Sequence, residues 1–200
     1  MLDLDFEKAF LTDEIKVICG VDEAGRGPLM GPVVAAACVL PEGIVIEGLN
    51  DSKKLTEKKR EYLFDIICEK ALYYSIVSVD EKTIDKINIL ESTYLAFSKS
   101  IENLSVMPDV ALIDGNRAKN IPVDFETVIK GDSLSQSIAA ASILAKVSRD
   151  RYIVRMDELY PQYGFKKHKG YGTKDHLDAI KKFGPCPIHR LTFKGVKEYV

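Results

Sequence analysis

The sequence predicts a mixed α/β domain, in which one sheet is flanked by helices. Short continuous apolar runs, which suit buried strands, come first, and helical segments then alternate with further strands. The chain has 200 residues, enough for one domain with its own core. No apolar stretch reaches the roughly 18 residues that a membrane-spanning helix needs, so we expect no membrane association.

The first part of the chain predicts three strands and one helix. Lys16–Val21 and Val33–Leu40 are apolar runs separated by a turn rich in Gly and Pro, and each predicts a buried strand. Thr56 suits a helix N-cap, and the spacing of apolar residues after it predicts a helix to about Leu72. Tyr73–Val79 then has the composition of a strand.

The middle of the chain predicts a helix followed by two strands. Asn88–Leu104 has a helical pattern, and Pro108 separates it from the next element. Val110–Ile113 is short and apolar, so it predicts a buried strand. Phe125–Lys130 alternates between apolar and polar residues and predicts another strand.

A long helix is expected to begin at Ser133 or Ser135 and to end before Pro161. Its small residues indicate close packing on the sheet. Tyr163–Thr173 is rich in Gly and Lys and predicts a loop, which is followed by a helix at Lys174–Phe183 and a tail punctuated by prolines. We expect residues 161–200 to be a small basic part of a single domain that spans residues 1–200.

Charge is distributed unevenly along the chain. The net charge is −2, but residues 140–200 carry +7 and residues 1–139 carry −9. The basic C-terminal third indicates a face that attracts polyanions, although a solvated helical surface without a partner gives the same pattern. The four cysteines are widely spaced and the N-terminus is acidic, so we expect a cytoplasmic protein with reduced thiols.

Three apolar runs end in acidic residues. Asp22 follows the first predicted strand, Asp114 follows the strand at Val110–Ile113, and Asp132 follows the strand after that. If these strands are parallel neighbours, their carboxylates meet at one edge of the sheet. Glu23 joins them only if the chain leaves regular strand geometry after Asp22, because successive side chains of a strand point to opposite faces.

Such a carboxylate cluster predicts a divalent-metal site. Four negative charges in one crevice repel one another strongly and require a cation. Oxygen ligands without His or Cys suit Mg²⁺ or Mn²⁺. Two such ions roughly 4 Å apart can activate water and stabilise the leaving oxygen of a phosphodiester. The alternative is that each aspartate merely caps a turn or a helix, as Asp114 before Gly115 and Asp132 before a serine both could.

A glycine-rich turn, GRGPLMG at residues 25–31, follows the acidic pair. It is not a GxxxxGK[ST] phosphate loop, and Gly31 falls one position late for GxGxxG. Gly25 and Gly27 nevertheless permit a close approach of the backbone to a ligand. Arg26 adds a planar donor suited to phosphate.

Five segments follow one another along the chain: GVDEAGRGPLMGPVVAAA from Gly20, DSKKL (Asp51–Leu55), IDG (Ile113–Gly115), GDSLSQSIAAASILAKVSRD (Gly131–Asp150) and HKGYGTKDH (His168–His176). In this order they resemble the motifs of bacterial ribonuclease HII, a type 2 RNase H, and the resemblance covers about residues 16–192. The Gly-Arg-Gly triplet favours type HII over type HIII, which carries Thr in place of Arg, and no extra N-terminal domain of the kind expected in type HIII precedes the first strand.

The resemblance implies an RNase H-like fold: a five-stranded mixed sheet flanked by helices, with a small helical C-terminal part. It implies an endonuclease that uses two Mg²⁺ or Mn²⁺ ions to cleave RNA in RNA–DNA hybrids. It also implies nicking of duplex DNA 5′ of embedded ribonucleotides, which leaves 3′-hydroxyl and 5′-phosphate ends. The cellular role would be ribonucleotide removal and RNA primer degradation in DNA replication and repair. We expect a monomer.

The resemblance assigns two sets of residues. The first set would bind the metal ions, and the second would contact nucleic acid, with the Gly-Arg-Gly backbone reading the ribose 2′-hydroxyl that distinguishes RNA from DNA. Tyr171 would stack on the neighbouring deoxyribose, although simple packing of this ring is the alternative. The metal set is Asp22, Glu23, Asp114 and Asp132, and the substrate set is Gly25, Arg26, Gly27, Tyr171, Lys53 and Lys146.

Other polar residues receive less specific roles. Arg149 and Arg151 are candidates for phosphate contacts, with ordinary surface positions as the alternative. Asp150 is expected to pair with neighbouring basic residues rather than to bind metal. A structural role is expected for the three histidines, which lack metal-ligand spacing: His168, His176 and His189.

Two other functions are compatible with parts of the pattern. A Mg²⁺-dependent nucleotide phosphohydrolase would use the same carboxylates, but the sequence has no phosphate loop. A non-catalytic module that binds RNA–DNA hybrids would use the basic segment and would bind without cleavage.

Overall fold

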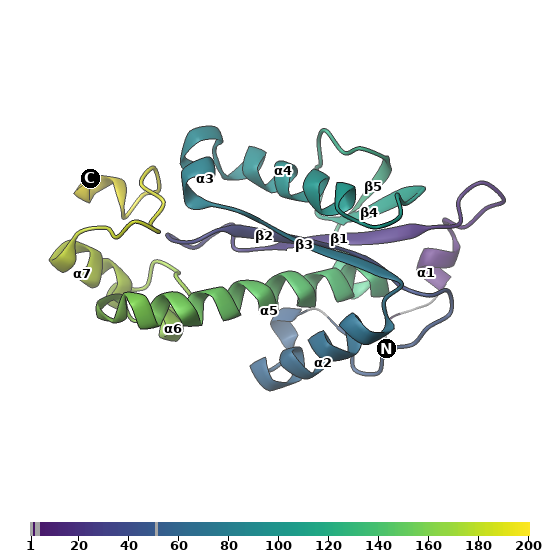
Figure 1. Cartoon of the computed structure of the whole chain (residues 1–200), viewed down its shortest axis with the longest axis horizontal. Coiled ribbons are helices and arrows are strands. Elements are labelled where there is room, and N and C mark those ends of the chain that lie inside the picture. The colour runs from purple at the N-terminus through teal and green to yellow at the C-terminus, as the bar shows by residue number, and fades with distance from the viewer. Residues whose placement is uncertain (1, 3–4, 51) are drawn as a thin grey trace.

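The computed structural model describes residue 2 and residues 5–50 and 52–200, so Asp51 of the DSKKL motif lies outside the described residues. A five-stranded sheet lies at the centre, with the strand order β3-β2-β1-β4-β5 (Figure 1). The strands are β1 (Ile18–Ala24), β2 (Val33–Val39), β3 (Tyr73–Val79), β4 (Val110–Asp114) and β5 (Asp124–Val128).

The sheet is mixed, as predicted. β2 pairs antiparallel with both β1 and β3, whereas β4 lies parallel to β1 and to β5. In the β1–β4 ladder the last pair joins Val21 and Ile113, so Asp22 and Asp114 come next on their two strands. Parallel strands end at the same edge of a sheet, and this register places the two carboxylates side by side there.

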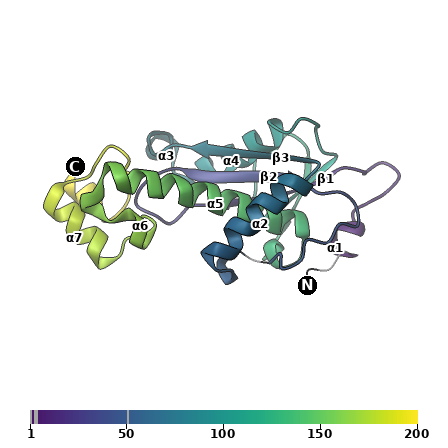
Figure 2. The same cartoon turned by 60° about the horizontal axis from the view of Figure 1, so that its bottom comes forward.

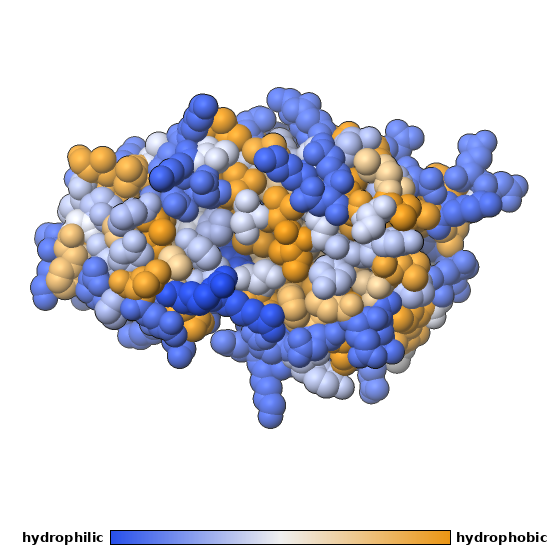
Figure 3. All heavy atoms as spheres, in the orientation of Figure 1, coloured by the Kyte–Doolittle hydropathy of each residue, from blue (hydrophilic) through white to orange (hydrophobic). Residues whose placement is uncertain are grey.

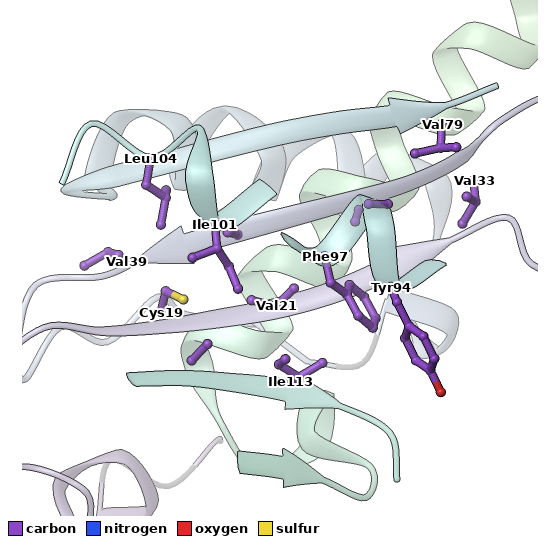
Figure 4. Close-up of a cluster of buried hydrophobic side chains, with 14 of the residues drawn as sticks. Cys19, Val21, Val33, Val39, Val79, Tyr94, Phe97, Ile101, Leu104 and Ile113 are labelled. Carbon is purple, nitrogen blue, oxygen red and sulfur yellow. The ribbon is translucent and has the colours of Figure 1, made fainter. Parts of the chain in front are cut away.

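One face of the sheet is covered by α4 (Ile89–Glu102) and α3 (Glu81–Ile87) (Figure 1). The strand residues on this face are apolar at alternate positions, as strand geometry requires. Figure 4 shows side chains from α4, among them Phe97, packed over Val21 and Ile113 of the sheet. This core fixes the strands that carry the acidic residues.

The opposite face is covered by α2 (Glu57–Lys70) and α5 (Gln136–Leu159), as Figure 2 also shows. The predicted close packing of α5 on the sheet is confirmed. A Cβ atom at Gly20 would stand 2.1 Å from the backbone nitrogen of Ile138, so only glycine fits where this helix crosses β1. Thr56 and Ser135 cap the two helices by accepting hydrogen bonds from their first turns, as predicted.

The C-terminal part lies at one end of the sheet and contains α6 (Phe165–His168) and α7 (Lys174–Phe183) (Figures 1 and 2). Its apolar cluster includes Leu29 and Met30, which belong to the turn after β1. The small part therefore packs directly on the Gly-Arg-Gly turn.

Three helices were not predicted. A helix, α3, lies where none was expected, and a short helix, α6, interrupts the expected loop at Tyr163–Thr173. A further short helix, α1 (Asp5–Lys8), precedes the sheet. On the surface view in Figure 3, hydrophobic side chains form small groups among hydrophilic ones. In the described part of the chain, no helix is long and apolar enough to cross a membrane.

Candidate active site

The acidic pair Asp22–Glu23 lies inside β1 rather than after it. The strand continues to Ala24, and Asp22 and Glu23 pair with Ala36 and Ala35 of β2. The condition set for Glu23, that the chain leaves regular strand geometry after Asp22, is therefore not met: backbone pairing continues although the side chains become polar. The two carboxylates consequently project from opposite faces of the strand.

The surroundings of the pair agree with this arrangement. Asp22 is buried on the α5 side, where its carboxylate accepts a hydrogen bond from the Ser142 side chain. Glu23 lines a cavity on the α4 side together with Thr93 and Phe97. Because both residues lie at the edge of the sheet, the charge of Asp114 still acts on each of them.

Asp114 is the last residue of β4 and is held in place by the following segment. The backbone N–H of Gly131 donates a 2.7 Å hydrogen bond to its Oδ1. Gly131 and Asp132 belong to a short 3₁₀ turn before α5, and the Asp132 side chain is buried there, accepting a hydrogen bond from Ser133 Oγ at 3.3 Å. Asp132 does not cap the long helix, because Ser135 does.

The structure therefore brings three of the four predicted carboxylates into electrostatic contact. Asp22, Glu23 and Asp114 influence one another, and Asp132 adjoins Asp114 through Gly131. As they are placed, no three His, Cys, Asp or Glu side chains in the described residues form a group that could hold a metal ion.

Burial and mutual repulsion alter the titration of the site. Desolvation raises the pKa of Asp22 well above its ordinary value, and the charges of Glu23 and Asp114 raise it further. Desolvation also raises the pKa of Glu23, with the neighbouring Arg26 opposing and Asp114 adding to the effect. A positive charge bound at this edge of the sheet would therefore stabilise the ionised carboxylates.

A cavity of about 250 Å³ opens beside Glu23 and Asp114. Two arginines line it: Arg26, whose Nη1 lies 3.4 Å from Glu23 Oε1, and Arg117. Carboxylates and guanidinium groups around one cavity suit a phosphodiester, since the arginines can bind phosphate oxygens and the carboxylates a cation. Sequence reasoning missed Arg117, although its place three residues after Asp114, at the end of a buried strand, was a usable signal.

The Gly-Arg-Gly turn and Tyr171 lie together, as the resemblance implies. A Cβ atom at Gly27 would stand 3.3 Å from the Tyr171 ring, and that ring is half exposed. Gly25 has a φ of +101°, a conformation that favours glycine. The turn begins at Gly25, two residues after Glu23, so it connects the acidic pair to the residues beside the aromatic ring.

Two arginines of the C-terminal half hold this turn from inside. Arg149 is almost completely buried and donates to the backbone carbonyls of Met30, Pro32 and Lys169, so its predicted phosphate contact is wrong. Arg190, which sequence reasoning missed, is also buried and donates to further carbonyls of the turn.

The remaining basic candidates have partners within the protein. Lys146 Nζ lies 2.7 Å from Asp150 Oδ1, which confirms the expected pairing of Asp150. Arg151 pairs with Glu61 on α2. Lys53 lies in a 3₁₀ turn (Ser52–Lys54), and its charge acts favourably on Glu23, so it faces the acidic edge.

The expected structural role of the histidines is confirmed. His176 Nε2 and His189 Nε2 lie 3.1 Å apart, and the His168 ring stacks on His176. His176 Nδ1 also bonds the carbonyl of Tyr171, and His189 Nδ1 accepts from the Cys186 N–H. This buried cluster supports the loop that carries Tyr171.

Comparison with known proteins identifies the family. The family model described as Ribonuclease HII matches residues 19–196. A Ribonuclease HII from Ruminiclostridium cellulolyticum is 58% identical over 98% of this chain and 76% of its own length. One from Caldicellulosiruptor bescii is 54% identical over 94% of this chain and 92% of its own length.

Solved structures agree. The ribonuclease H2 of Pyrococcus horikoshii OT3 has a TM-score of 0.78 at 28% identity, covering 92% of this chain and 97% of its own. Bst-RNase HIII in complex with Mn²⁺ shares the fold, with a TM-score of 0.69 at 17% identity over 92% of this chain and 68% of its own. A ribonuclease HII is a hydrolase with ribonuclease H activity on RNA–DNA hybrids, rather than a binding module or a nucleotide phosphohydrolase. On these matches, the chain belongs to the ribonuclease HII family of endonucleases.

Proposed function

We propose that this chain cleaves the RNA strand of RNA–DNA hybrids and nicks duplex DNA on the 5′ side of an embedded ribonucleotide. The products would carry 3′-hydroxyl and 5′-phosphate ends, and the cellular role would be ribonucleotide removal and RNA primer degradation during DNA replication and repair. One observation carries the proposal: the acidic pair Asp22–Glu23 and the Gly-Arg-Gly turn lie within residues 22–27, and Gly27 of the turn lies against the Tyr171 ring.

Divalent cations fit the donor set at the sheet edge. The ligands would be oxygen atoms of Asp22, Glu23, Asp114 and Asp132, which suit Mg²⁺ or Mn²⁺. The raised pKa of Asp22, caused by burial and by repulsion from its acidic neighbours, supports a missing positive charge at this place. The four carboxylates would have to move closer together to hold an ion. When bound, two such ions supply an activated water and stabilise the leaving oxygen.

The protein's own residues would orient the substrate around this centre. The Gly131 N–H fixes one oxygen of Asp114, so that the other remains for a ligand. Arg26 and Arg117 line the adjoining cavity and would bind phosphate oxygens of the cleaved strand. Lys53 and Lys146 would contact the backbone further along, in exchange for their present acidic partners.

Recognition of the sugar would come from the turn and the aromatic ring. Backbone groups of Gly25, Arg26 and Gly27 can contact a 2′-hydroxyl without regard to the base. The half-exposed ring of Tyr171 offers a flat surface for the neighbouring sugar. The enzyme would thus select one ribose by its hydroxyl while remaining indifferent to sequence.

The test uses a labelled DNA duplex that contains a single ribonucleotide, incubated with Mg²⁺ or Mn²⁺. We expect one nick 5′ of the ribose, with a 3′ end that a DNA polymerase extends. Asp22→Asn should slow nicking by roughly a thousandfold or more, because a metal ligand is lost. Asp178→Asn makes the same chemical change on the exposed face of α7 and should leave the rate unchanged. Equal nicking by the Asp22→Asn variant, or no nick by the wild type, would refute the proposal.

A further inference from the structure

Arg190 binds the Gly-Arg-Gly turn from the side opposite the solvent. Its side chain is completely buried, and its guanidinium donates four hydrogen bonds, all to backbone carbonyls. Nη2 bonds the carbonyl of Gly25 at 2.6 Å, and Nη1 bonds those of Arg26 at 3.0 Å and Pro28 at 2.8 Å. Nε bonds the carbonyl of Gly31 at 2.9 Å. One planar group therefore fixes both ends of the turn.

This buried charge has no ion-pair partner among the described residues. Asp85 and Glu81 favour the charge only at longer range. Burial lowers the pKa of Arg190 to about 9, so the guanidinium remains charged at neutral pH. Burying a cation without a carboxylate is costly, and an apolar side chain of similar size would often serve stability as well or better. The arrangement points to a role other than stabilisation.

The bonds to Arg190 decide which backbone groups of the turn remain available. The carbonyls of Gly25 and Arg26 are occupied by the guanidinium. The N–H groups of Leu29 and Gly31 donate into the protein, to Gly170 and Ile188. Within the described residues, the N–H groups of Arg26 and Gly27 have no hydrogen-bond partner. Among the described residues, the Gly-Arg-Gly backbone therefore keeps the N–H groups of Arg26 and Gly27 and the carbonyl of Gly27 without a partner, whereas the carbonyls of Gly25 and Arg26 are occupied.

The guanidinium is itself fixed by the structure around it. The backbone N–H of Arg190 donates to the carbonyl of Leu29, and the guanidinium lies 5.0 Å from the centre of the Phe193 ring. The next two residues are tied to α3, because Asp85 accepts hydrogen bonds from the N–H groups of Leu191 and Thr192. Arg190 thus connects a rigid helix to the turn.

We infer that Arg190 is a positioning residue for ribose recognition, which holds the turn so that the N–H groups of Arg26 and Gly27 meet the 2′-hydroxyl of the substrate. This inference rests on the proposed sugar-reading role of the turn. Arg190→Lys tests it, because an ammonium group keeps the charge but cannot bond four carbonyls in one plane. Arg60→Lys is the matched control, since Arg60 also donates to two backbone carbonyls, those of Ser52 and Leu55, and neither belongs to the turn.

The experiment measures binding by fluorescence anisotropy in EDTA, with two duplexes that differ by a single 2′-hydroxyl. The readout is the ratio of the two dissociation constants, which a loss of stability alone does not change. We expect Arg190→Lys to reduce the preference for the ribose duplex by roughly tenfold, as expected for loss of a well-placed hydrogen bond. If the wild-type preference is itself below about tenfold, the variant should show none. Arg60→Lys should lower the melting temperature but retain the preference.

Each outcome is decisive. If the wild type shows no preference, the sugar-reading role itself fails. If the wild type discriminates and folded Arg190→Lys discriminates equally well, only the role of Arg190 is overturned. If Arg190→Lys does not fold, Asp85→Ala replaces it, because this half-buried residue anchors the segment that carries the arginine. Its preference should fall by about twofold or more, and an unchanged preference would overturn the inference.

Discussion

A methyl group at Gly25 should disrupt the turn that follows the acidic pair. In Gly25→Ala, the new Cβ atom would stand 2.1 Å from Arg149 Nε, 2.5 Å from Arg149 Cδ and 2.8 Å from the carbonyl oxygen of Pro32. The Arg149 side chain cannot move aside cheaply, because three hydrogen bonds to backbone carbonyls hold it. The backbone at this position also has a φ of +101°.

The magnitude follows from these two effects. A left-handed conformation costs a residue with a Cβ atom about 1–2 kcal/mol. Overpacking of a well-filled interior costs about 1–3 kcal/mol more. The free energy of unfolding should therefore fall by about 2–5 kcal/mol in Gly25→Ala. Gly43→Ala is the control, since φ there is +72° and no atom lies within 4 Å of the new Cβ, so only the first cost of about 1–2 kcal/mol applies.

Urea unfolding followed by circular dichroism measures both variants against the wild type. We expect Gly25→Ala to lose at least about 1 kcal/mol more than Gly43→Ala, the lower limit for overpacking. Equal losses in the two variants would show that the turn can relax around a side chain, and the close packing against Arg149 would then have no energetic weight.

Three further predictions concern the site and its support. Burial raises the pKa of Asp22 above its ordinary 3.8, so the metal-free protein should lose stability as pH rises above about 4. Asp22→Asn should therefore resist urea better than the wild type at pH 7, and a less stable variant would contradict this. Gly27→Ala should change the free energy of unfolding by less than about 1 kcal/mol, because its Cβ meets only the Tyr171 ring. The same variant should lower kcat/KM for nicking by roughly tenfold, and an unchanged kcat/KM would show that this position does not contact the substrate. Burial lowers the pKa of His176 and His189 from 6.5 to about 4, so the free energy of unfolding should fall as pH drops from 6.5 towards 4. The loss should reach up to about 3 kcal/mol for each ring. A constant melting temperature across this range would be inconsistent with the buried cluster.

The sheet could be predicted well because its strands are short apolar runs. Tyr73–Val79 forms a strand with the predicted bounds, and Val33–Val39 differs by one residue. The first strand was predicted to stop before Asp22, since hydropathy marks a strand end where polar residues begin. Backbone pairing does not depend on side-chain polarity, so a strand that enters a catalytic site continues past that signal. The helix Glu81–Ile87 was missed because Ile84 is its only buried residue and leaves almost no periodic pattern.

The site could be predicted only in part. The approach of Asp22 to Asp114 follows from two parallel neighbouring strands, which the sequence suggests directly. The roles of Arg149 and Arg190 do not, because their partners are carbonyl groups that every residue carries, and Arg190 lies 164 positions from Arg26. A buried arginine and a surface arginine look the same in a sequence, so the phosphate contact expected of Arg149 was wrong.

The central claim is that acidic side chains from separate strands hold divalent ions beside the turn. Titration of Mn²⁺ into the protein, with free Mn²⁺ measured by electron paramagnetic resonance, tests this claim without relying on catalysis. We predict that the wild type binds Mn²⁺ and that Asp22→Asn and Asp114→Asn each weaken binding by roughly tenfold or more, the effect of about 1.4 kcal/mol. Wild-type affinity in both variants would show that the ion, if any, binds elsewhere, and the account would be wrong.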